Sequence, residues 1–235
     1  MKYALFAVSV LVCFASGDFL DDFESYQPGE RLESSGWWLR VPTGGYARAA
    51  VLEGNQAAEA VFGDSSYIGY LCTAAGFWDD GSMAMDFSPE GSGSLAAVLA
   101  RMHIPTGGAY MAGMTVLVQP FTYTYIGYIN ISGDYELLYS GPGPLLPPGG
   151  WMNLRLELEG NGPVTLTLYI NGQETAQVVD SQYSLGLGLS GFALLYEGSV
   201  PTVFCDNYQV LQGFQSLARS TFGAVKTLFL RGGAE

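Results

Sequence analysis

Apolar and polar residues alternate along much of this chain, most clearly between residues 151 and 159. In Trp151-Met-Asn-Leu-Arg-Leu-Glu-Leu-Glu159 the even positions are apolar, and the odd positions after the tryptophan are polar. This period of two residues is typical of a strand with one buried face. Residues 164–170 repeat the pattern, and Asn171-Gly172 then provides two residues that tolerate the positive φ angles of a type I′ turn. The sequence therefore predicts a β-hairpin here.

Similar short runs occur before this region, and three more follow Gly172. The earlier runs are residues 19–25, 37–41, 47–53, 57–62, 66–73, 82–87, 94–103, 110–119, 121–131 and 135–139. Turn clusters rich in Gly, Asp and Pro separate them. About fourteen strands and no convincing helix predict an all-β fold, a two-sheet antiparallel jelly-roll sandwich. The Pro- and Gly-rich residues 141–150 form a loop within this single domain, which we place at residues 18–210.

Residues 1–17 have the composition of a secretory signal peptide. Lys2 is followed by an apolar run over residues 3–14 and by the small residues Ala15-Ser16-Gly17. The run falls short of the roughly 20 residues that a membrane-spanning helix needs. We therefore expect a chain without a transmembrane span that is exported from a bacterial cell, starts at Asp18 when mature, and acts outside the cell or at its surface.

The last residues, 211–235, differ from the rest of the chain. Their apolar side chains recur every three or four residues, apart from one gap of five, which predicts an amphipathic helix. These apolar residues are Leu211, Phe214, Leu217, Phe222, Val225, Leu228 and Phe229. One interpretation is a docking or surface-retention segment. The other is a helix that packs on the sandwich or frays.

The charge of the chain excludes one class of partner. With 9 Lys and Arg against 22 Asp and Glu, the formal net charge is −13. Loss of Lys2 with the signal peptide changes it to −13 − 1 = −14. A nucleic-acid backbone would be repelled by such a protein, so nucleic acid is not an expected partner.

Two cysteines remain once Cys13 has left with the signal peptide. Cys72 and Cys205 would then form an even pair in an oxidising compartment, which predicts a disulfide between them. The alternative is a pair of buried free thiols that pack as small hydrophobic residues. The disulfide requires Cα atoms about 6 Å apart, a distance that the sequence does not reveal.

Four short motifs together carry a resemblance to a known superfamily. They are Asp21-Asp22-Phe23-Glu24-Ser25-Tyr26, Trp37-Trp38, Leu168-Tyr-Ile-Asn-Gly172 and Val203-Phe-Cys-Asp-Asn207. Residues 18–210 resemble the concanavalin A-like lectin/glucanase superfamily, most closely its laminin G-like jelly rolls and the keto-disaccharide hydrolase-like modules of bacterial secreted proteins. The resemblance implies a jelly roll with a concave and a convex sheet, in which the first and last strands are neighbours.

No catalytic set of residues is visible in the sequence. The laminarinase-like enzymes of this superfamily carry a Glu-x-Asp-x-x-Glu strand, and the nearest string here, Met83-Ala-Met-Asp86 with Glu90 beyond it, lacks the first glutamate. Glu157 and Glu159 share a strand face at about 7 Å, but a solvated strand of alternating charge explains them without catalysis. His103 is the single histidine of the chain, so a zinc site or a His-centred triad lacks its other members.

Calcium is the more plausible inorganic ligand. If the alternating apolar residues between 204 and 210 face the core, Asp206 shares that face, where a bare carboxylate is costly unless it is paired or metal-bound. The sandwich topology would bring Asp22 and Glu24, next to Asp21, close to it. In related sugar-binding jelly rolls an acidic opening strand and a closing Asp hold a structural calcium ion. The alternative is that Asp206 and Asn207 only form hydrogen bonds to the backbone of the first strand.

Aromatic residues point to sugar binding, because a pyranose ring stacks its apolar CH face on Trp or Tyr. Tyr123 and Tyr125 share one face of a predicted strand, and Tyr128 and Asn130 follow just beyond them. Trp78 lies in a predicted loop, where a large aromatic side chain is unusual. These five residues are the candidate ligand contacts, with a polysaccharide or glycan as the expected partner.

The favoured hypothesis is therefore a secreted, non-catalytic carbohydrate-binding or adhesion module. A glycoside hydrolase of the keto-disaccharide-acting kind is the second, with carboxylates that the sequence does not reveal. A structural protein of the cell surface, in which the tail matters more than the sandwich, is the third.

Overall fold

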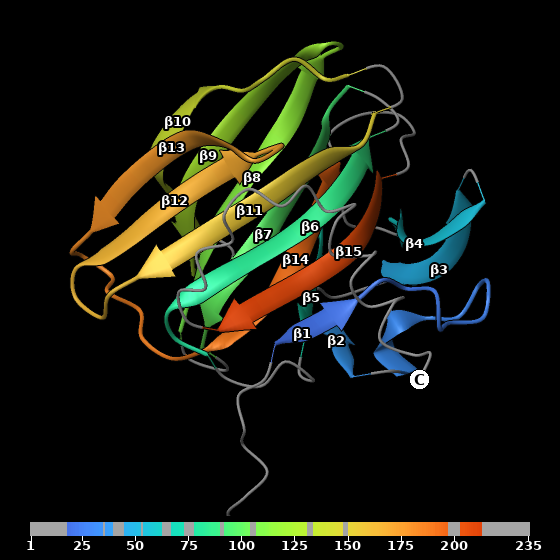
Figure 1. Ribbon diagram of the computed structural model, residues 1–235, viewed down its shortest axis with the longest axis horizontal. Coiled ribbons are helices and arrows are strands. Elements are labelled where there is room, and N and C mark those ends of the chain that lie inside the picture. The colour runs from blue at the N-terminus through green and yellow to red at the C-terminus, as the bar shows by residue number, and fades with distance from the viewer. Residues whose placement is uncertain are drawn as a thin grey trace, which may run out of the picture.

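The computed structural model is a sandwich of two antiparallel sheets (Figure 1). It describes residues 18–34, 36–39, 45–52, 54–62, 67–72, 78–89, 92–103, 107–130, 134–147, 150–196 and 203–212. The predicted signal peptide, residues 1–17, and residues 213–235 of the predicted tail lie outside these ranges. Within the described ranges, no helix is long and apolar enough to cross a membrane.

Sheet A has the strand order β13-β12-β11-β6-β15-β4-β3, and β1 pairs with β15 beside this path. Its strands are β1 Phe19–Asp21, β3 Tyr46–Leu52, β4 Asn55–Val61, β6 Gly81–Pro89, β11 Met152–Glu159, β12 Val164–Ile170, β13 Gln173–Asp180 and β15 Val203–Gln212. In Figure 1 this sheet lies nearer the viewer, with β11, β12 and β13 in yellow and orange.

Sheet B has the strand order β10-β9-β8-β7-β14-β5-β2. Its strands are β2 Trp37–Leu39, β5 Tyr67–Cys72, β7 Ser94–Met102, β8 Ala109–Val118, β9 Phe121–Ile129, β10 Tyr135–Pro142 and β14 Leu189–Tyr196. A short 3₁₀ helix, η1, spans Leu32–Ser34. The green strands β7 to β10 form the layer behind sheet A (Figure 1).

The predicted all-β sandwich and its central hairpin are confirmed. Strand β12 turns into β13 through Asn171 and Gly172, whose φ angles are 51° and 77°, as a type I′ turn requires. The first and last strands are neighbours, since Phe19–Asp21 of β1 pairs with residues 208–210 of β15. Strand β15 continues to Gln212, so the first two residues of the predicted tail belong to the sandwich.

Between the sheets lies a core of aliphatic and aromatic side chains. The even positions of β11 predicted to be buried, such as Leu154 and Leu156, are fully buried there. Trp37 of β2 packs on Phe192 and Tyr208 with ring centroids 5.0 and 5.1 Å away. Aromatic residues from both sheets thus fill the space between them.

A bulge in β15 changes which side chains of that strand face the core. In β15, the three residues after Asp206 face only two of β6, and Asn207 has a φ of 50°. Before this bulge Cys205 faces the core, whereas after it Tyr208 does. Asp206 therefore does not share a face with Tyr208, and the expectation that it lies on the core face is wrong. A bulge adds one residue and so shifts the period-2 pattern.

The predicted disulfide is not formed. Cys72 of β5 and Cys205 of β15 are buried thiols on opposite sheets, and no bond joins them. Burial raises the pKa of the Cys205 thiol well above its usual range. Facing sheets lie about 10 Å apart on average, so a disulfide between them requires the two strands to approach locally to a Cα separation of about 4.4–6.8 Å. The large rings of Phe192 and Tyr208, with centroids 5.8 Å apart, occupy the space between the sheets.

Candidate functional site

The outer face of sheet B is apolar, although no described helix or strand forms a further layer over it, which is unusual for an antiparallel sheet. In β7, for example, Ala96 and Val98 face the inter-sheet core, while Ala97 and Leu99 belong to a second apolar cluster. This second cluster comprises Ala97, Leu99, Met102, Ala109, Met111, Tyr125, Leu189 and Ala193. The sheet therefore has hydrophobic side chains on both faces.

A groove lies on this outer face and encloses about 480 Å³. Its lining residues come from β7, β8, β9, β10 and β14. They are Leu95, Met111, Tyr123, Tyr125, Ile129, Tyr135, Leu137 and Leu195. None of these eight described residues is charged, and three tyrosine hydroxyls are their only side-chain hydrogen-bonding groups. A volume of this size is in the usual range for small-molecule sites.

Two glycines shape the groove. A Cβ atom on Gly127 of β9 would lie 2.5 Å from the ring and hydroxyl of Tyr135, so only glycine lets this ring lie across the strand. The Tyr135 ring meets that of Tyr125 edge-on, with centroids 5.9 Å apart. A Cβ atom on Gly113 of β8 would lie 2.2 Å from the carbonyl oxygen of Ala96. Gly113 thus permits the close packing of β8 on β7, and Gly127 that of β9 on β10, beneath the groove.

The structure brings together two of the five candidate sugar contacts. Tyr123 and Tyr125 both line the groove, as their shared strand face predicts. Tyr128 has the opposite parity in β9 and stacks on Tyr183, with ring centroids 3.7 Å apart. Asn130 bonds to Asp134 in the turn between β9 and β10. These last two residues do not line the groove.

Trp78 also lies away from the groove, just before β6 and outside the named strands. It is 1% exposed and forms a β-bridge with Gly188, with backbone hydrogen bonds of 3.0 Å in both directions. A partner more than a hundred positions away in the chain therefore fixes it in the core. Local turn residues around Trp78 give no sign of this partner.

The predicted calcium ligands do not form a compact group in the described residues, where no three His, Cys, Asp or Glu side chains could hold a metal ion. Asp206 accepts a hydrogen bond of 2.7 Å from the backbone N–H of Asn207. Asp22 accepts one from Glu24 N–H, while the Glu24 carboxylate accepts one from Gln56 N–H. Asp206 thus bonds to the neighbouring backbone N–H and not to the backbone of β1, and calcium stays a prediction.

Asp206 is nevertheless an unusual carboxyl group. Burial raises its pKa to about 7, and the neighbouring carboxylates of Asp86, Asp22 and Glu24 raise it further, against a lowering by the Asn207 N–H. Burial also raises the pKa of Asp86, although its two oxygens accept hydrogen bonds from Asn153 and Asn207. A buried carboxyl, that of Asp206, and a half-buried one, that of Asp86, therefore lie side by side on the outer face of sheet A.

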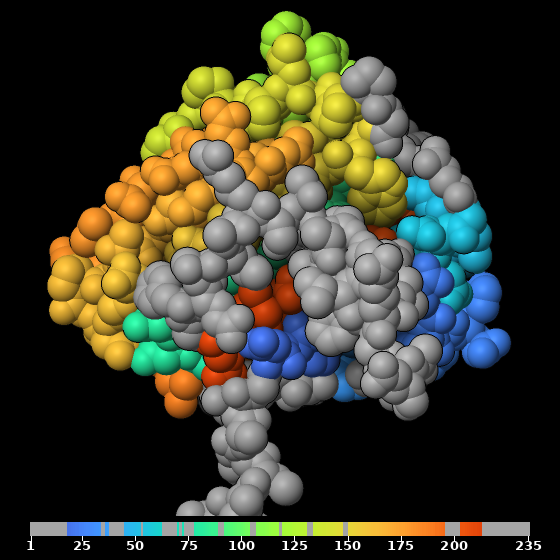
Figure 2. Space-filling view, viewed as in Figure 1, coloured from blue at the N-terminus to red at the C-terminus, as the bar shows by residue number. Residues whose placement is uncertain are grey.

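Charged side chains of β11 on that face pair with one another, as is common on protein surfaces. Glu157 forms an ion pair of 2.6 Å with Arg155, whose guanidinium lies 4.0 Å from the centroid of the Tyr169 ring. This agrees with the solvated, charge-alternating strand predicted for β11. Figure 2 is a view onto this side of the molecule, with β12 and β13 in orange at one edge and β3 and β4 in blue and cyan at the other.

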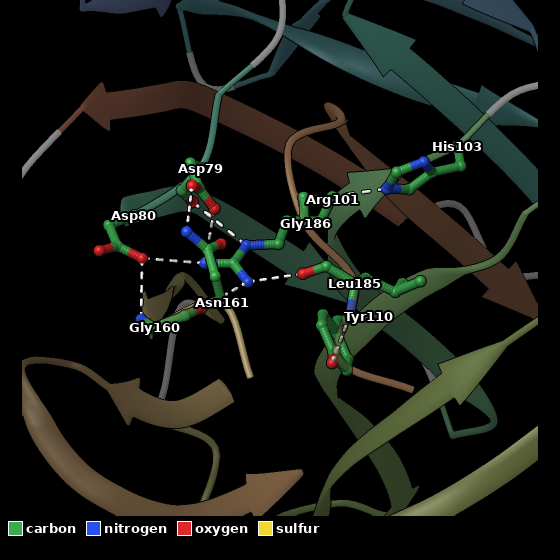
Figure 3. Close-up of polar contacts among 9 residues, drawn as sticks. All are labelled: Asp79, Asp80, Arg101, His103, Tyr110, Gly160, Asn161, Leu185 and Gly186. Atoms are coloured by element: carbon green, nitrogen blue, oxygen red, sulfur yellow. Dashed lines mark hydrogen bonds and ion pairs between the residues drawn. The ribbon is translucent and has the colours of Figure 1, made fainter. Parts of the chain in front are cut away.

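A polar junction at one end of the sandwich was not predicted. Arg101 of β7 is fully buried, has a φ of 48°, and lies in a bulge, where the four residues from Leu99 to Met102 face only the three residues from Leu189 to Gly191 of β14. Figure 3 shows its guanidinium among Asp79, Asp80, Gly160 and Leu185, which lie in the segments before β6, after β11 and before β14. A charged residue within the apolar run of 95–102 was the available signal, because buried charges require partners.

Protein oxygen atoms pair with all three nitrogen atoms of the Arg101 guanidinium (Figure 3). It forms ion pairs of 3.1 Å with Asp79 and 3.0 Å with Asp80. It also donates to the carbonyl oxygens of Gly160 at 2.8 Å and Leu185 at 2.6 Å. We call these five residues the Arg101 junction. Its hydrogen bonds are used to hold the strand ends together.

Comparison with known proteins agrees with the fold. No family model and no curated protein match the sequence. Solved structures match it over most of its length. A Bacillus subtilis protein of unknown function with a galectin-like fold has a TM-score of 0.58 at 14% identity, with 83% of this chain and 94% of that chain covered.

Two further structures are similar to a comparable degree. The carbohydrate-binding module CBM66 from Bacillus subtilis has a TM-score of 0.55 at 13% identity, covering 74% of this chain and 93% of that chain. A prokaryotic β-1,3-1,4-glucanase (lichenase) from a mouse hindgut metagenome has a TM-score of 0.57 at 12% identity, with 84% of this chain and 100% of that chain covered. The chain is thus a two-sheet β-sandwich protein. More particularly, its fold is that of the concanavalin A-like jelly rolls, as the sequence motifs indicated.

Proposed function

We propose that this protein is a secreted, non-catalytic carbohydrate-binding module whose ligand lies in the groove on the outer face of sheet B. The observation that carries the proposal is the gathering of Tyr123, Tyr125 and Tyr135 in one groove. Similar structures include a carbohydrate-binding module and a glucanase, which supports a sugar ligand at the level of the fold.

The chemistry of tyrosine suits this role. An aromatic ring offers a flat apolar surface to the CH face of a pyranose, and the phenol hydroxyl can bond to a sugar hydroxyl. Tyr123 and Tyr125 are two positions apart on one strand, so their Cα atoms lie about 7 Å apart. Tyr135 extends the aromatic surface from the neighbouring strand, with its ring over Gly127. Three rings on two strands can therefore contact more than one sugar unit.

Binding is favoured over hydrolysis by the residues that line the groove. Hydrolysis of a glycoside needs two carboxyl groups roughly 5–9.5 Å apart on either side of the scissile bond. The eight described lining residues include no Asp or Glu. Asp79 and Asp80 are bound to Arg101, and Glu157 is bound to Arg155, so these carboxylates have structural partners elsewhere.

A binding screen of the full chain against soluble polysaccharides and oligosaccharides tests the proposal. Saturable binding that is lost in Tyr123→Ala and Tyr135→Ala is the expected result. Tyr169→Ala is the matched control, because Tyr169 lies on the outer face of sheet A. Binding that survives both groove variants, or no binding by a folded protein, would contradict the proposal. Repeating the screen with calcium and with a chelator tests the calcium prediction.

A further inference from the structure

The groove has a chemical character that an unmodified sugar chain does not fully match. Five of its eight lining residues are aliphatic, namely Leu95, Met111, Ile129, Leu137 and Leu195. Hydroxyl groups buried against such side chains lose their hydrogen bonds to water, and each unpaired group weakens binding. The tyrosines can satisfy only a few sugar hydroxyls. Much of the groove is therefore suited to a ligand surface without polar groups.

The aliphatic residues are spread across all five strands that form the groove. Leu95 of β7 pairs with Leu195 of β14, while Met111 of β8 and Leu137 of β10 both pair with Gly127 between them. These pairs lie at two levels of the sheet, and the level between them, with Ala97, Gly113 and Tyr125, carries no charged side chain. A flat sugar ring needs only one aromatic platform, whereas a lining of this extent matches an extended hydrocarbon.

Exposed apolar side chains continue the groove toward the turn between β8 and β9. Phe121 has the same strand parity as Tyr123 and is 61% exposed, and Leu117 in the facing strand is 53% exposed. At the opposite side Leu137 is 54% exposed. Contiguous exposed apolar surface on a soluble protein marks a site of interaction. The apolar surface is therefore longer than the enclosed part of the groove.

Charge complementarity restricts the ligand further. The chain has a formal net charge of −13, yet the described lining residues carry no charge. Burial raises the pKa of the Tyr135 hydroxyl, which keeps this rim group neutral. A ligand with an ionic group would find no opposite charge among these residues. The occupant is thus neutral as well as largely apolar.

We infer that the groove binds a neutral glycoside that carries a hydrocarbon chain, such as an alkyl or acyl glycoside. The inference rests on the proposed function, because the tyrosines contact the sugar while the aliphatic residues contact the chain. Hydrocarbon burial then provides a large part of the affinity.

Calorimetric titration of the full chain with hexyl, octyl and decyl β-glucoside, below their critical micelle concentrations, tests this inference. Each added methylene is expected to tighten binding by up to about fourfold until the groove is filled. Glucose and cellobiose serve as ligands without a chain. An alkyl dimethylamine oxide serves as a ligand with an equally long chain and no sugar.

The outcomes separate this inference from the proposed function. Affinity that rises with chain length, and that falls when the sugar is replaced by the amine oxide group, supports both. Affinity that rises with chain length regardless of the head group supports the hydrocarbon site and contradicts the carbohydrate-binding function. Equal binding of cellobiose and all three glucosides supports carbohydrate binding and overturns the inference.

A charge placed in the groove gives a second test. Leu137→Glu is expected to weaken octyl glucoside binding by roughly tenfold or more, because the carboxylate must lose water when the chain binds. Leu137 is 54% exposed, so the variant should fold. Val179→Glu is the matched control, since Val179 of β13 is 61% exposed on a strand outside the groove. An equal effect of both changes, or of neither, would overturn the assignment of the chain to this groove.

Discussion

The Arg101 junction and the groove are the two regions of this molecule that depart from a simple sandwich, and they do so in opposite ways. The junction concentrates charge, but each carboxylate and carbonyl that it brings together contacts the same guanidinium. The groove has almost no polar groups, but its apolar surface is open to a ligand. Clusters of charged residues often mark functional sites. In this protein the charged cluster is structural, and the candidate site is apolar.

The largest expected effect concerns the junction. Arg101→Met should lower the free energy of unfolding by roughly 3–5 kcal/mol, because it leaves the carboxylates of Asp79 and Asp80 and the carbonyls of Gly160 and Leu185 without their donor. Urea unfolding monitored by circular dichroism measures this change. Binding to the groove should remain in the fraction that is folded.

Arg48→Met is the control for this variant. The Arg48 side chain is 41% exposed and pairs with Glu59 at 2.7 Å, so its loss should cost no more than about 1 kcal/mol. The comparison fails if Arg101→Met is no more destabilising than Arg48→Met, or if it abolishes binding without changing stability.

A smaller effect is expected at Asp206, a buried acid whose charged neighbours are themselves acids. Its pKa is raised from 3.8 to about 7, mainly by burial, so the folded state holds the proton more tightly than the unfolded state. Stability from this group is therefore full at acid pH and is lost as the pH rises through about 7. Asp206→Asn should raise the free energy of unfolding by roughly 1–3 kcal/mol at pH 8 and change it little at pH 4.

Unfolding curves of the wild type and of Asp206→Asn over this pH range check the sign. Glu174→Gln, at an exposed position of β13, is the control and should show no such pH-dependent difference. A difference between wild type and Asp206→Asn that grows toward acid pH would be the wrong sign. Addition of calcium at pH 8 should stabilise the wild type only if the calcium prediction is right.

The smallest expected effect is that of one hydroxyl in the groove. Tyr123→Phe keeps the ring and removes the hydroxyl, so glycoside binding should weaken by about two- to tenfold while stability stays within about 0.5 kcal/mol. Tyr123→Ala should weaken it more, because the stacking surface is lost as well. Titration of both variants beside Tyr169→Phe separates the two contributions. Equal affinity of Tyr123→Ala and wild type would show that the ring makes no contact.

The period-2 pattern made the strands predictable, since each strand has at least one apolar face. The same pattern correctly placed Tyr123 and Tyr125 on one face of β9. It failed at Asp206, because one extra residue at Asn207 shifts the alternation and leaves no signature in composition. The pattern also did not reveal the bulge at Arg101, because the extra residue there likewise leaves no signature in composition.

Other features depend on residues that are far apart in the chain. Trp78 is buried through its bridge to Gly188, and the disulfide between Cys72 and Cys205 is absent although both thiols face the core. The groove itself requires five strands in register and a glycine at position 127 beneath Tyr135. Local sequence does not specify which strands become neighbours, so these features needed the structure.

The central claim is that the ligand lies on the outer face of sheet B. Methionine methyl NMR tests it directly, because Met111 lines the groove while Met83 is fully buried between the sheets. The full chain with ¹³C-labelled methionine methyl groups would be titrated with octyl β-glucoside, and the Met111 signal assigned with Met111→Leu.

We predict a saturable shift of the Met111 methyl signal at the affinity measured by calorimetry, with the Met83 signal nearly unchanged. Binding detected by calorimetry without a shift at Met111 would place the ligand elsewhere and contradict the account.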